Sequence, residues 1–544
     1  MPSVSHRGNT WDPRITTPAS SGFVNVKDVA FGALGDGATD DRLAFTAAFA
    51  YATANGMSVY VPTGTYMISR NSATASGFDT TAYPNLTIVG AGPGKTVIKM
   101  LNPGPPYNVS NFWLFEVRSD GFSLEDLTLD GAFPQGSSSG WNEQIHLVNL
   151  GFGNTSGTVT GAKFHNVEFR DVRGDGIRMV GATGGGEVSD VRIVNCDFLR
   201  CHRAGVGVQR GARRVLISHC NFSGSNDQDI DFEPTGSGYN SEFQIVNNFM
   251  NRDWNPGTLS VSLAGNSMTY RHSRSIFANN VILNGGVSAR YVAQLRIADN
   301  IVYVTGATTS MPCIELFEGA DDCVVAGNWC YRDGAVIGKV VQVYAASGNE
   351  PNGIQVTENT LHQYTGDGVL RLDAAEESVV ANNQVYYHSA ATNTDTGINV
   401  QSTGGTTTGV RVTGNTVRGA VGGGTLQYGI SIGGSSAIDR VICNDNDVSG
   451  TATSDIRWNG TITSVPVAIG NKMTSLGFGG YSNAGGAVIV GGNSDFPVFQ
   501  VIATPEAAIT ASPGAQARRV VGGGAGTCFY VKESGSGNTG WVAK

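Results

Sequence analysis

Apolar and polar residues alternate strictly in a short segment that recurs along most of the chain. In each copy two apolar residues enclose one polar or small residue, and Gly, Asn or Asp residues lie near its ends. A period of two predicts a β-strand with one buried face, whereas helical repeats would show an apolar spacing near 3.6 residues. The copies are Ile177–Met179, Val206–Val208, Ile230–Phe232, Leu259–Val261, Val287–Ala289, Ile314–Leu316, Val341–Val343, Leu370–Leu372, Ile398–Val400 and Ile430–Ile432.

A second recurring position carries Asn or an acidic residue, and its members are separated by roughly 20 to 32 residues, the span of one solenoid repeat. We expect this column to be structural, at a turn where Asn tolerates left-handed backbone angles and bonds the Asn of the next coil about 4.8 Å away. Its members are Glu168, Asp197, Asn221, Asn248, Asn280, Asn300, Asn328, Asn359, Asn383, Asn415, Asn446 and Asn471. The two columns predict an all-β fold, a right-handed parallel β-helix with three sheets, over residues 67–475.

The chain before the repeats has a different pattern. Residues 1–22 would form an N-terminal arm, and residues 23–66 combine a strand, a turn in GALGDG and a helix at about Asp40–Asn55. Thr39 is the expected N-cap of this helix, and Gly56 lies just past its end. A short helix across the open end of a β-stack covers apolar side chains, so we expect residues 23–66 to be an N-terminal cap.

After the last Asn of the column the coil pattern fades. We expect a Gly-rich linker at residues 476–497 and a small C-terminal β unit at residues 498–544. A short β segment cannot bury the rings of Phe529, Tyr530 and Trp541 alone, which favours assembly around a symmetry axis. The C-terminal unit is therefore predicted to serve oligomerisation, in a parallel homotrimer.

Composition narrows the range of functions. The 544 residues carry a formal net charge of -9 and only 15% are charged, so no basic field is available for a nucleic acid partner. The N-terminal sequence lacks the apolar core of a signal peptide, and no stretch of about 18 apolar residues predicts membrane insertion. The eight cysteines contain no pair of CxxC motifs, so we expect buried free thiols, no metal site and no cofactor.

The densest group of chemically active side chains is the segment NDQDIDFEP. Because Ile230 and Phe232 belong to the inward-facing positions, Asp229, Asp231 and Glu233 should all face solvent along one strand. Alternate residues of a strand are about 6.5–7 Å apart, within the ~6.5–9.5 Å between the carboxyls of inverting glycoside hydrolases, and side-chain tilt could shorten this to the retaining distance. Crowding would raise one pKa and give a protonated acid beside an ionised base. We predict all three as catalytic; a solvated acidic strand and a calcium site are the alternatives.

Neighbouring coils would surround this strand with groups that can bind a sugar chain lying along the helix. Stacking at about 4.8 Å per coil places Glu315 roughly 14 Å from Asp231, a suitable distance for another sugar unit. Arg side chains would bind an acidic substituent, and Trp254 or Trp141, both in loops, would stack on a sugar ring. The predicted substrate-binding residues are Arg178, Gln209, Trp254, Arg290 and Glu315.

The segment Arg271-His272-Ser273-Arg274 is the candidate site of an alternative activity. Elimination on a uronic acid needs a base at C5 and a cation on the carboxylate, and this segment supplies both residue types. No nucleophile signature such as GxSxG accompanies the histidines of the chain. A lyase is therefore the alternative to a hydrolase.

The segment FVNVKDVAFGALGDGATDDRLAFTAAFAYATANGMSVYVPTGTY, residues 23–66, resembles the opening of the pectate-lyase-like domain of phage tailspikes and related polysaccharide depolymerases. It contains GDGxTDD, an Ala-rich helix and a VPxGxY strand in this order, and beyond it only the coil pattern matches, to about residue 475. The final segment TCFYVKESGSGNTGWVAK resembles the tip of phage tail and prophage proteins. The resemblance implies the right-handed β-helix more strongly than any chemistry, because this fold hosts hydrolases, lyases, epimerases and purely binding spikes.

The resemblance and the clustered carboxylates together lead us to expect a depolymerase of a phage or prophage tail. It would cleave a bacterial surface polysaccharide, such as capsule, O-antigen or exopolysaccharide, by glycosidic hydrolysis, and a phage tail adaptor is a candidate partner. The alternatives are a lyase or epimerase that acts on a uronic-acid glycan, a non-catalytic receptor-binding spike, and a structural or adhesin β-helix.

Overall fold

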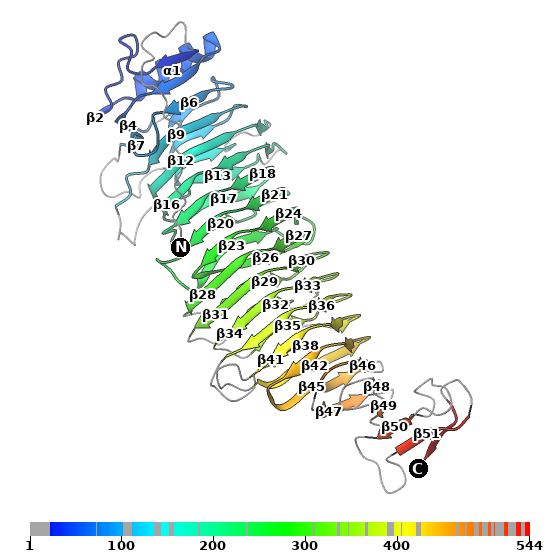
Figure 1. Ribbon diagram of the computed structural model, residues 1–544. Helices are drawn as coiled ribbons and strands as arrows, with labels where there is room; N and C mark the ends of the chain where they lie inside the picture. The colour runs from blue at the N-terminus through cyan, green and yellow to red at the C-terminus, as the bar shows by residue number, and fades with distance from the viewer. Residues whose placement is uncertain are drawn as a thin grey trace.

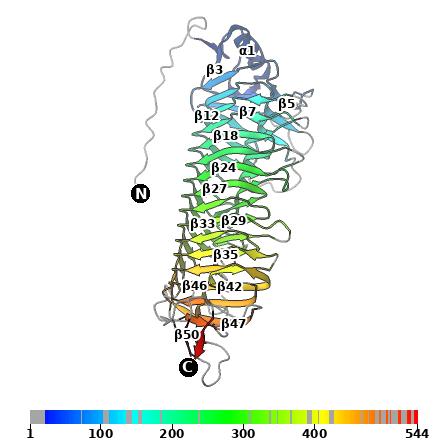
Figure 2. The same ribbon diagram turned by 90° about the vertical axis from the view of Figure 1, so that its right-hand side faces the viewer.

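The computed structural model shows an all-β parallel solenoid of about 13 turns with 3% helix (Figure 1). The coils stack along one long axis, and the view in Figure 2 shows the same stack from the side. The structure describes residues 22–544 except 72, 102–110, 135–142, 152–156, 183–184, 236–237, 308–309, 335–337, 346–347, 365–367, 389–395, 404, 420–425, 464–466, 474–475, 484–488, 492–498, 502–504, 506–515, 520–528 and 535–538.

The strands of successive coils form three stacks. One stack is a separate sheet that begins at β5 (Ser76–Asp79) and includes β20 (Gln228–Phe232). The other two belong to one larger sheet, because β12 (Lys163–Val172) runs through both of them and pairs with β15 (Arg192–Val194) in one and with β16 (Asp197–Cys201) in the other. Within the coils each described strand pairs in parallel with the strand of the same stack one coil later, for example β18 (Ala212–Ser218) with β21 (Ser241–Val246). The parallel solenoid is as predicted, with three stacks of strands that belong to two sheets.

Apolar side chains fill the interior of the coils in layers. Ile230 and Phe232 are 0% and 1% exposed, so the alternation of β20 points them inward as predicted. The rings of Phe169, Phe198 and Phe222 stack coil upon coil, with centroids 4.8 and 4.7 Å apart. Burial of these side chains is the main source of stability of a solenoid, and it fixes which residues of each strand face outward.

A ladder of buried Asn side chains runs along one turn of the solenoid. From Asn248 to Asn471 the Nδ2 of each Asn donates to the Oδ1 of the next at 2.9 to 3.0 Å. The expected structural role is therefore confirmed for this part of the column. The left-handed backbone conformation occurs not at the ladder residues themselves but at the residue before each of them. Asn247 and Asn279, for example, have φ of 59° and 56°.

The first three members of the predicted column do not belong to the ladder. Asn221 pairs with Phe249 and not with Asn248, and its Nδ2 donates to Asp197 at 2.7 Å. The ladder position of this coil is held by Cys220, whose backbone N–H donates to Asn248 Oδ1 at 3.0 Å. The predicted alignment is thus wrong by one residue here. The seven described cysteines are buried free thiols, as expected, and Cys528 lies outside the described residues.

The predicted N-terminal helix is α1 (Arg42–Asn55), which ends at Gly56 in the left-handed conformation. Its N-cap position is Asp41 and not Thr39, and the Asp41 carboxylate accepts two backbone N–H groups of the preceding turn at 2.7 and 3.0 Å. The ring of Phe45 stacks on that of Phe78 at 5.7 Å. The helix therefore packs on the first coils at one end of the stack (Figure 1), and its function as a cap stays a prediction. This helix is too short to cross a membrane, and no other helix occurs in the described part of the chain.

The C-terminal region differs from the expectation at two points. The stack continues into the expected linker, because β47 (Leu476–Asn483) pairs in parallel with the preceding coil. Beyond it, β51 (Phe529–Lys532) and β52 (Trp541–Ala543) form an antiparallel pair. Tyr530 and Trp541 are each 7% exposed within one chain, so the expectation that the three rings cannot be buried alone is wrong for these two, whereas Phe529 is partly exposed. The homotrimer stays a prediction without this support.

Candidate active site

The candidate site lies on the outer face of the stack that contains β17 (Ala204–Arg210), β20 and β23 (Thr258–Ala264). The register places Asp231 of β20 beside Gly207 of the preceding coil and beside Ser262 of the following coil. The predicted alignment of Ile230–Phe232 with Leu259–Val261, which places Ser260 beside Asp231, is wrong by two residues. A shift of two keeps every side chain on the same face, so the outward direction of Asp231 is as predicted.

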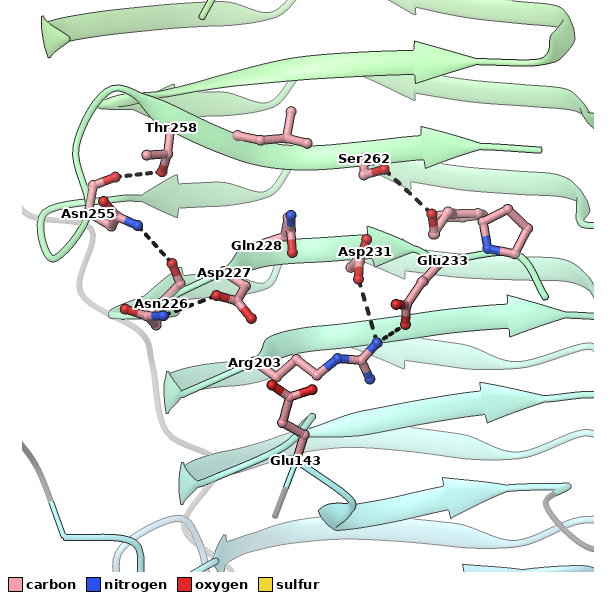
Figure 3. Close-up of a pocket in the computed structure, with 13 residues that line it drawn as sticks. Glu143, Arg203, Asn226, Asp227, Gln228, Asp231, Glu233, Asn255, Thr258 and Ser262 are labelled. Carbon is pink, nitrogen blue, oxygen red and sulfur yellow. Dashed lines mark hydrogen bonds and ion pairs between the residues drawn. The ribbon is translucent and has the colours of Figure 1, made fainter. Parts of the chain in front are cut away.

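A pocket of about 610 Å³ opens along β20 (Figure 3). Asp231 and Glu233 lie toward one end of it, and Asn226 and Asn255 lie at the other. The remaining polar lining consists of carboxylates, amides, hydroxyls and one cation, Arg203. Such a concave surface with converging polar groups is the usual form of a ligand site.

Asp229 does not reach this pocket. Its side chain is 0% exposed, so the expectation that it faces solvent is wrong. Its Oδ2 accepts a hydrogen bond from Ser260 Oγ at 2.7 Å; burial raises the pKa of Asp229, and the positive charge of the buried Arg252 opposes this shift. Arg252 in turn donates to the carbonyls of Ser225 and Asn226, both at 3.1 Å. Asp229 therefore supports the loop that forms one end of the pocket.

Arg203 joins the two carboxylates of the pocket to a third that is buried. Its Nη2 forms an ion pair with Glu233 and lies 3.8 Å from Asp231 Oδ2, and its Nη1 donates to Asp175 Oδ2 at 2.9 Å. Asp175 is 0% exposed, and its backbone N–H donates to His146 Nδ1 at 2.9 Å. Neither Arg203 nor Asp175 was predicted from the sequence, because both lie just before their strands and outside the alternating positions.

The two pocket carboxylates, Asp231 and Glu233, differ in burial and in their ion pairs. Burial raises the pKa of Asp231 to about 6, Arg203 opposes the shift, and the neighbouring carboxylates of Glu233 and Asp227 add to it. The Asp231 side chain is 13% exposed, whereas that of Glu233 is 56% exposed and ion-paired with Arg203. Burial also raises the pKa of Asp175 to about 7. The site thus combines a carboxyl that holds a proton in mildly acidic solution with an ion-paired carboxylate.

The predicted substrate-binding residues do not line this pocket. Arg178 is 5% exposed and donates to Gln144 Oε1 at 2.9 Å, and the backbone carbonyl of Gln209 accepts from Thr235 at 3.3 Å. Trp254 is 53% exposed in the loop beside the pocket residue Asn255.

Arg290 and Glu315 lie farther along the same outer face. Glu315 follows Asp231 by three coils in register, as predicted, and accepts a hydrogen bond from Ser288 Oγ at 2.8 Å. Arg290 is ion-paired with Glu318 at 2.5 Å. Trp141 lies outside the described residues.

The alternative site around His272 is ruled out by burial. The His272 side chain is 0% exposed and lies against the rings of Phe232 and Phe243 at 4.7 and 5.5 Å. Burial lowers its pKa to about 4, and Arg274 pairs with Glu242 at 3.0 Å. His272 cannot reach a substrate, so the interpretation of this segment as a lyase site is wrong. Among the described residues no three His, Cys, Asp or Glu side chains are placed to hold a metal ion.

The fold and the pocket define a parallel β-helix protein with an acidic outer site. Residues 23–252 match the family described as rhamnogalacturonase A/epimerase, pectate lyase-like, and this range includes Asp231 and Glu233. The expected resemblance to pectate-lyase-like proteins is therefore confirmed over these residues.

Curated relatives match a shorter part of the chain. Mannuronan C5-epimerase AlgE3 of Azotobacter vinelandii is 46% identical over 110 residues, which make up 20% of this chain and 6% of that protein. Alginate lyase 7 of the same organism is 40% identical over 114 residues, 20% of this chain and 12% of that protein. The match thus covers only a small part of the length of these relatives.

Solved structures resemble the fold at low sequence identity. The A-module of Azotobacter vinelandii mannuronan C-5 epimerase AlgE6 has a TM-score of 0.45 and 18% identity, and the alignment covers 79% of this chain and 99% of the module. The Dettilon tailspike protein gp208 has a TM-score of 0.37 and 13% identity, over 81% of this chain and 69% of that chain.

Proposed function

We propose that this chain is a polysaccharide depolymerase that hydrolyses glycosidic bonds in the pocket along β20. The observation that carries the proposal is the pair Asp231 and Glu233, held by one guanidinium group at the wall of an open pocket. Glycoside hydrolases need one carboxyl that donates a proton to the leaving oxygen and a second that is ionised. Asp231, whose pKa is raised to about 6, is suited to the first role, and Glu233, which is ion-paired with Arg203, to the second.

The geometry also favours one stereochemical course. Both carboxylates contact the same nitrogen of Arg203, which brings them nearer to the ~5–5.5 Å of retaining enzymes than to the ~6.5–9.5 Å of inverting ones. In the proposed reaction Glu233 attacks the anomeric carbon while Asp231 protonates the leaving oxygen. Water, deprotonated by Asp231, then releases the sugar from Glu233. We therefore expect net retention of the anomeric configuration, which proton NMR of early products measures.

We also propose that the protein acts on a phage or prophage tail at the bacterial surface. The resemblance of residues 23–66 to the opening of tailspike depolymerases supports a location on a phage or prophage tail and a substrate on the bacterial surface. A homotrimer and a tail adaptor are the partners that we propose on this basis. Asp229 is not retained as a catalytic residue, because it is buried beneath the pocket.

The proposal is tested by incubating the full chain with a panel of bacterial capsules, O-antigens and exopolysaccharides. New reducing ends should form, and Asp231→Asn and Glu233→Gln should each lower their rate roughly 100- to 10,000-fold. Asp190→Asn, which alters an exposed carboxylate paired with Arg214, is the matched control and should leave the rate unchanged. Tight binding of a glycan without any cleavage would instead identify a receptor-binding spike.

A second candidate function is elimination or epimerisation on a uronic-acid chain. The observation that favours it is the 40–46% identity to alginate-modifying enzymes over about a fifth of the chain. Ultraviolet absorbance of an unsaturated uronate product would identify a lyase, and altered sugar stereochemistry without shortening would identify an epimerase.

A further inference from the structure

The pocket along β20 has a strong excess of negative charge. Four carboxylates line it, those of Glu143, Asp227, Asp231 and Glu233, and Arg203 is the one cation among its described lining residues. The side chains of Glu143 and Glu233 are more than half exposed, at 55% and 56%, so they face an incoming ligand directly. A sugar carboxylate that entered this pocket would meet several like charges.

The single cation of the pocket is already neutralised. Arg203 contacts three carboxylates, those of Asp175, Asp231 and Glu233, and its side chain is only 8% exposed. Even where Asp231 and Asp175, with pKa values raised to about 6 and 7, carry protons, the ion pair of Arg203 with Glu233 remains. Arg203 therefore has no positive charge left for a substrate anion.

Other cations near the pocket are also engaged. The buried Arg252 donates to carbonyls of the pocket loop and faces the carboxylate of Asp229. Arg173 Nη2 lies 3.8 Å from Glu143, and its Nη1 lies 2.9 Å from His202 Nδ1. Neither arginine is a lining residue of the pocket.

Asp227 adds to the negative charge of the pocket, at the end away from Glu233. It is exposed, and its Oδ1 accepts a hydrogen bond from Asn226 Nδ2 at 3.0 Å. Within the described part of the chain no Lys, Arg or His lies within ion-pair distance of it. Its charge therefore acts on whatever occupies the adjoining space.

The rest of the polar lining consists of neutral donors and acceptors. Gln228, Thr258 and Ser262 contribute an amide and two hydroxyls. The Thr258 hydroxyl donates to the carbonyl of Asn255 at 2.7 Å, and the Ser262 hydroxyl to that of Phe232 at 3.5 Å. Groups of this kind pair with sugar hydroxyl and acetamido groups and do not need a charged partner.

We propose that the pocket binds an uncharged sugar unit, so that the chain cleaved is a neutral or N-acetylated polysaccharide and not a polyuronate. This inference rests on the proposed hydrolysis and narrows its substrate class. It also separates this protein from the alginate-modifying enzymes to which part of it is similar. Elimination on a uronate would need a cation on the sugar carboxylate, and Arg203, the one cation among the described lining residues, is already paired with carboxylates.

The first test uses the full chain with Asp231→Asn, which retains the pocket but not the proposed acid. Affinity electrophoresis through gels that contain a panel of neutral or a panel of anionic polysaccharides, at low salt, measures binding. We expect retention by at least one neutral polymer, at least tenfold tighter than by any polyuronate. Tighter retention by a polyuronate, or retention by no polymer of either panel, would overturn the inference.

The second test changes the charge of the pocket without touching Asp231 or Glu233. The pair Glu143→Gln and Asp227→Asn should raise the affinity for a polyuronate several-fold at low salt, and the gain should vanish at high salt, where charges are screened. Glu187→Gln, which alters a partly exposed carboxylate that lies outside the pocket and pairs with Arg213, is the control. An unchanged affinity in the double variant would show that the pocket charges do not select the substrate.

The products of the unmodified chain separate this inference from the proposed function. Cleavage of a polyuronate to new reducing ends without ultraviolet absorbance would refute the substrate class and leave hydrolysis intact. Ultraviolet-absorbing products from a polyuronate would refute both. Cleavage of a neutral polymer alone would support both.

Discussion

Gly207 and the carboxylate of Asp175 occupy adjoining space, such that a Cβ atom at Gly207 would lie 2.5 Å from Asp175 Oδ2. Gly207 pairs in register with Asp231, so it is the outward position directly beside the candidate acid. The absent side chain leaves room for the buried Asp175, which holds Arg203 at 2.9 Å. Because Arg203 contacts both pocket carboxylates, this glycine is a requirement of the site and not only of the strand.

Replacing Gly207 by Ala should therefore impair the site. The added methyl group forces Asp175 away, and Arg203 loses the contact that positions it between Asp231 and Glu233. We expect glycan cleavage to fall at least about tenfold in kcat/KM and the fold to lose about 1–3 kcal/mol, a typical cost of overpacking. Ser288→Ala, three coils farther along the same outward column, is the control for both measurements. Unchanged activity of Gly207→Ala would show that Asp175 does not position Arg203 for the reaction.

The activity should depend on pH through Asp231. A general acid must carry its proton in the free enzyme, and burial raises the pKa of Asp231 to about 6. The value of kcat/KM should thus fall as pH rises through about 6. The substitution Arg203→Gln should shift this fall in kcat/KM to higher pH, because Arg203 favours the ionised form of Asp231 and its loss raises the pKa of Asp231. A fall that stayed at the same pH in that variant would rule out Asp231 as the titrating group.

The stability of the fold should depend on pH through the same residue. The pKa of Asp231 is raised from 3.8 to about 6 in the folded chain, so between these values the folded state binds more protons than the unfolded state. The contribution of Asp231 to the free energy of unfolding is fully present below about pH 4 and is lost as pH rises through about 6. The loss amounts to about 3 kcal/mol. Comparison of urea denaturation of the native chain and Asp231→Asn between pH 4 and 7 measures it. The two curves should differ in slope in this window, with the variant less dependent on pH.

The alternation of the sequence identified the strands and the side on which each residue lies, but it could not show what covers that side. Asp229 and Asp231 are two residues apart and lie on the same side of β20, yet only Asp231 opens to the pocket. Asp229 is buried, and its carboxylate accepts a hydrogen bond from Ser260 of the next coil. Arg203 lies in a turn, where periodicity carries no information about direction. The site is therefore assembled from one predicted acid and a network that only the stacking of coils creates.

The register between neighbouring coils was the second feature that could not be predicted reliably from the sequence. The motif around Asn221 resembles that around Asn248, but its Asn lies one residue later in the coil. The repeated asparagines are correctly recognised as a column from Asn248 onward, because there the spacing of apolar neighbours is regular. Where Cys220 replaces Asn in the ladder, the sequence offers a nearby Asn that belongs to a different position.

This correction predicts opposite outcomes for two similar substitutions. Asn328 is buried in the ladder: its Nδ2 donates to Asn359 Oδ1 and to the carbonyl of Ile297, and its Oδ1 accepts from the backbone and side chain of Asn300, all at 2.9 to 3.0 Å.

Asn328→Ala leaves several buried groups without partners, each at a cost of about 1–3 kcal/mol, so we expect a loss of at least about 3 kcal/mol in free energy of unfolding. Asn221→Ala removes one exposed contact with Asp197 and should cost less than about 0.5 kcal/mol. The midpoints of urea denaturation compare the two variants directly. Equal losses would mean that Asn221 belongs to the ladder after all, whereas a large loss for Asn328 alone follows from the one-residue shift, because only a residue enclosed between coils leaves partners that water cannot reach.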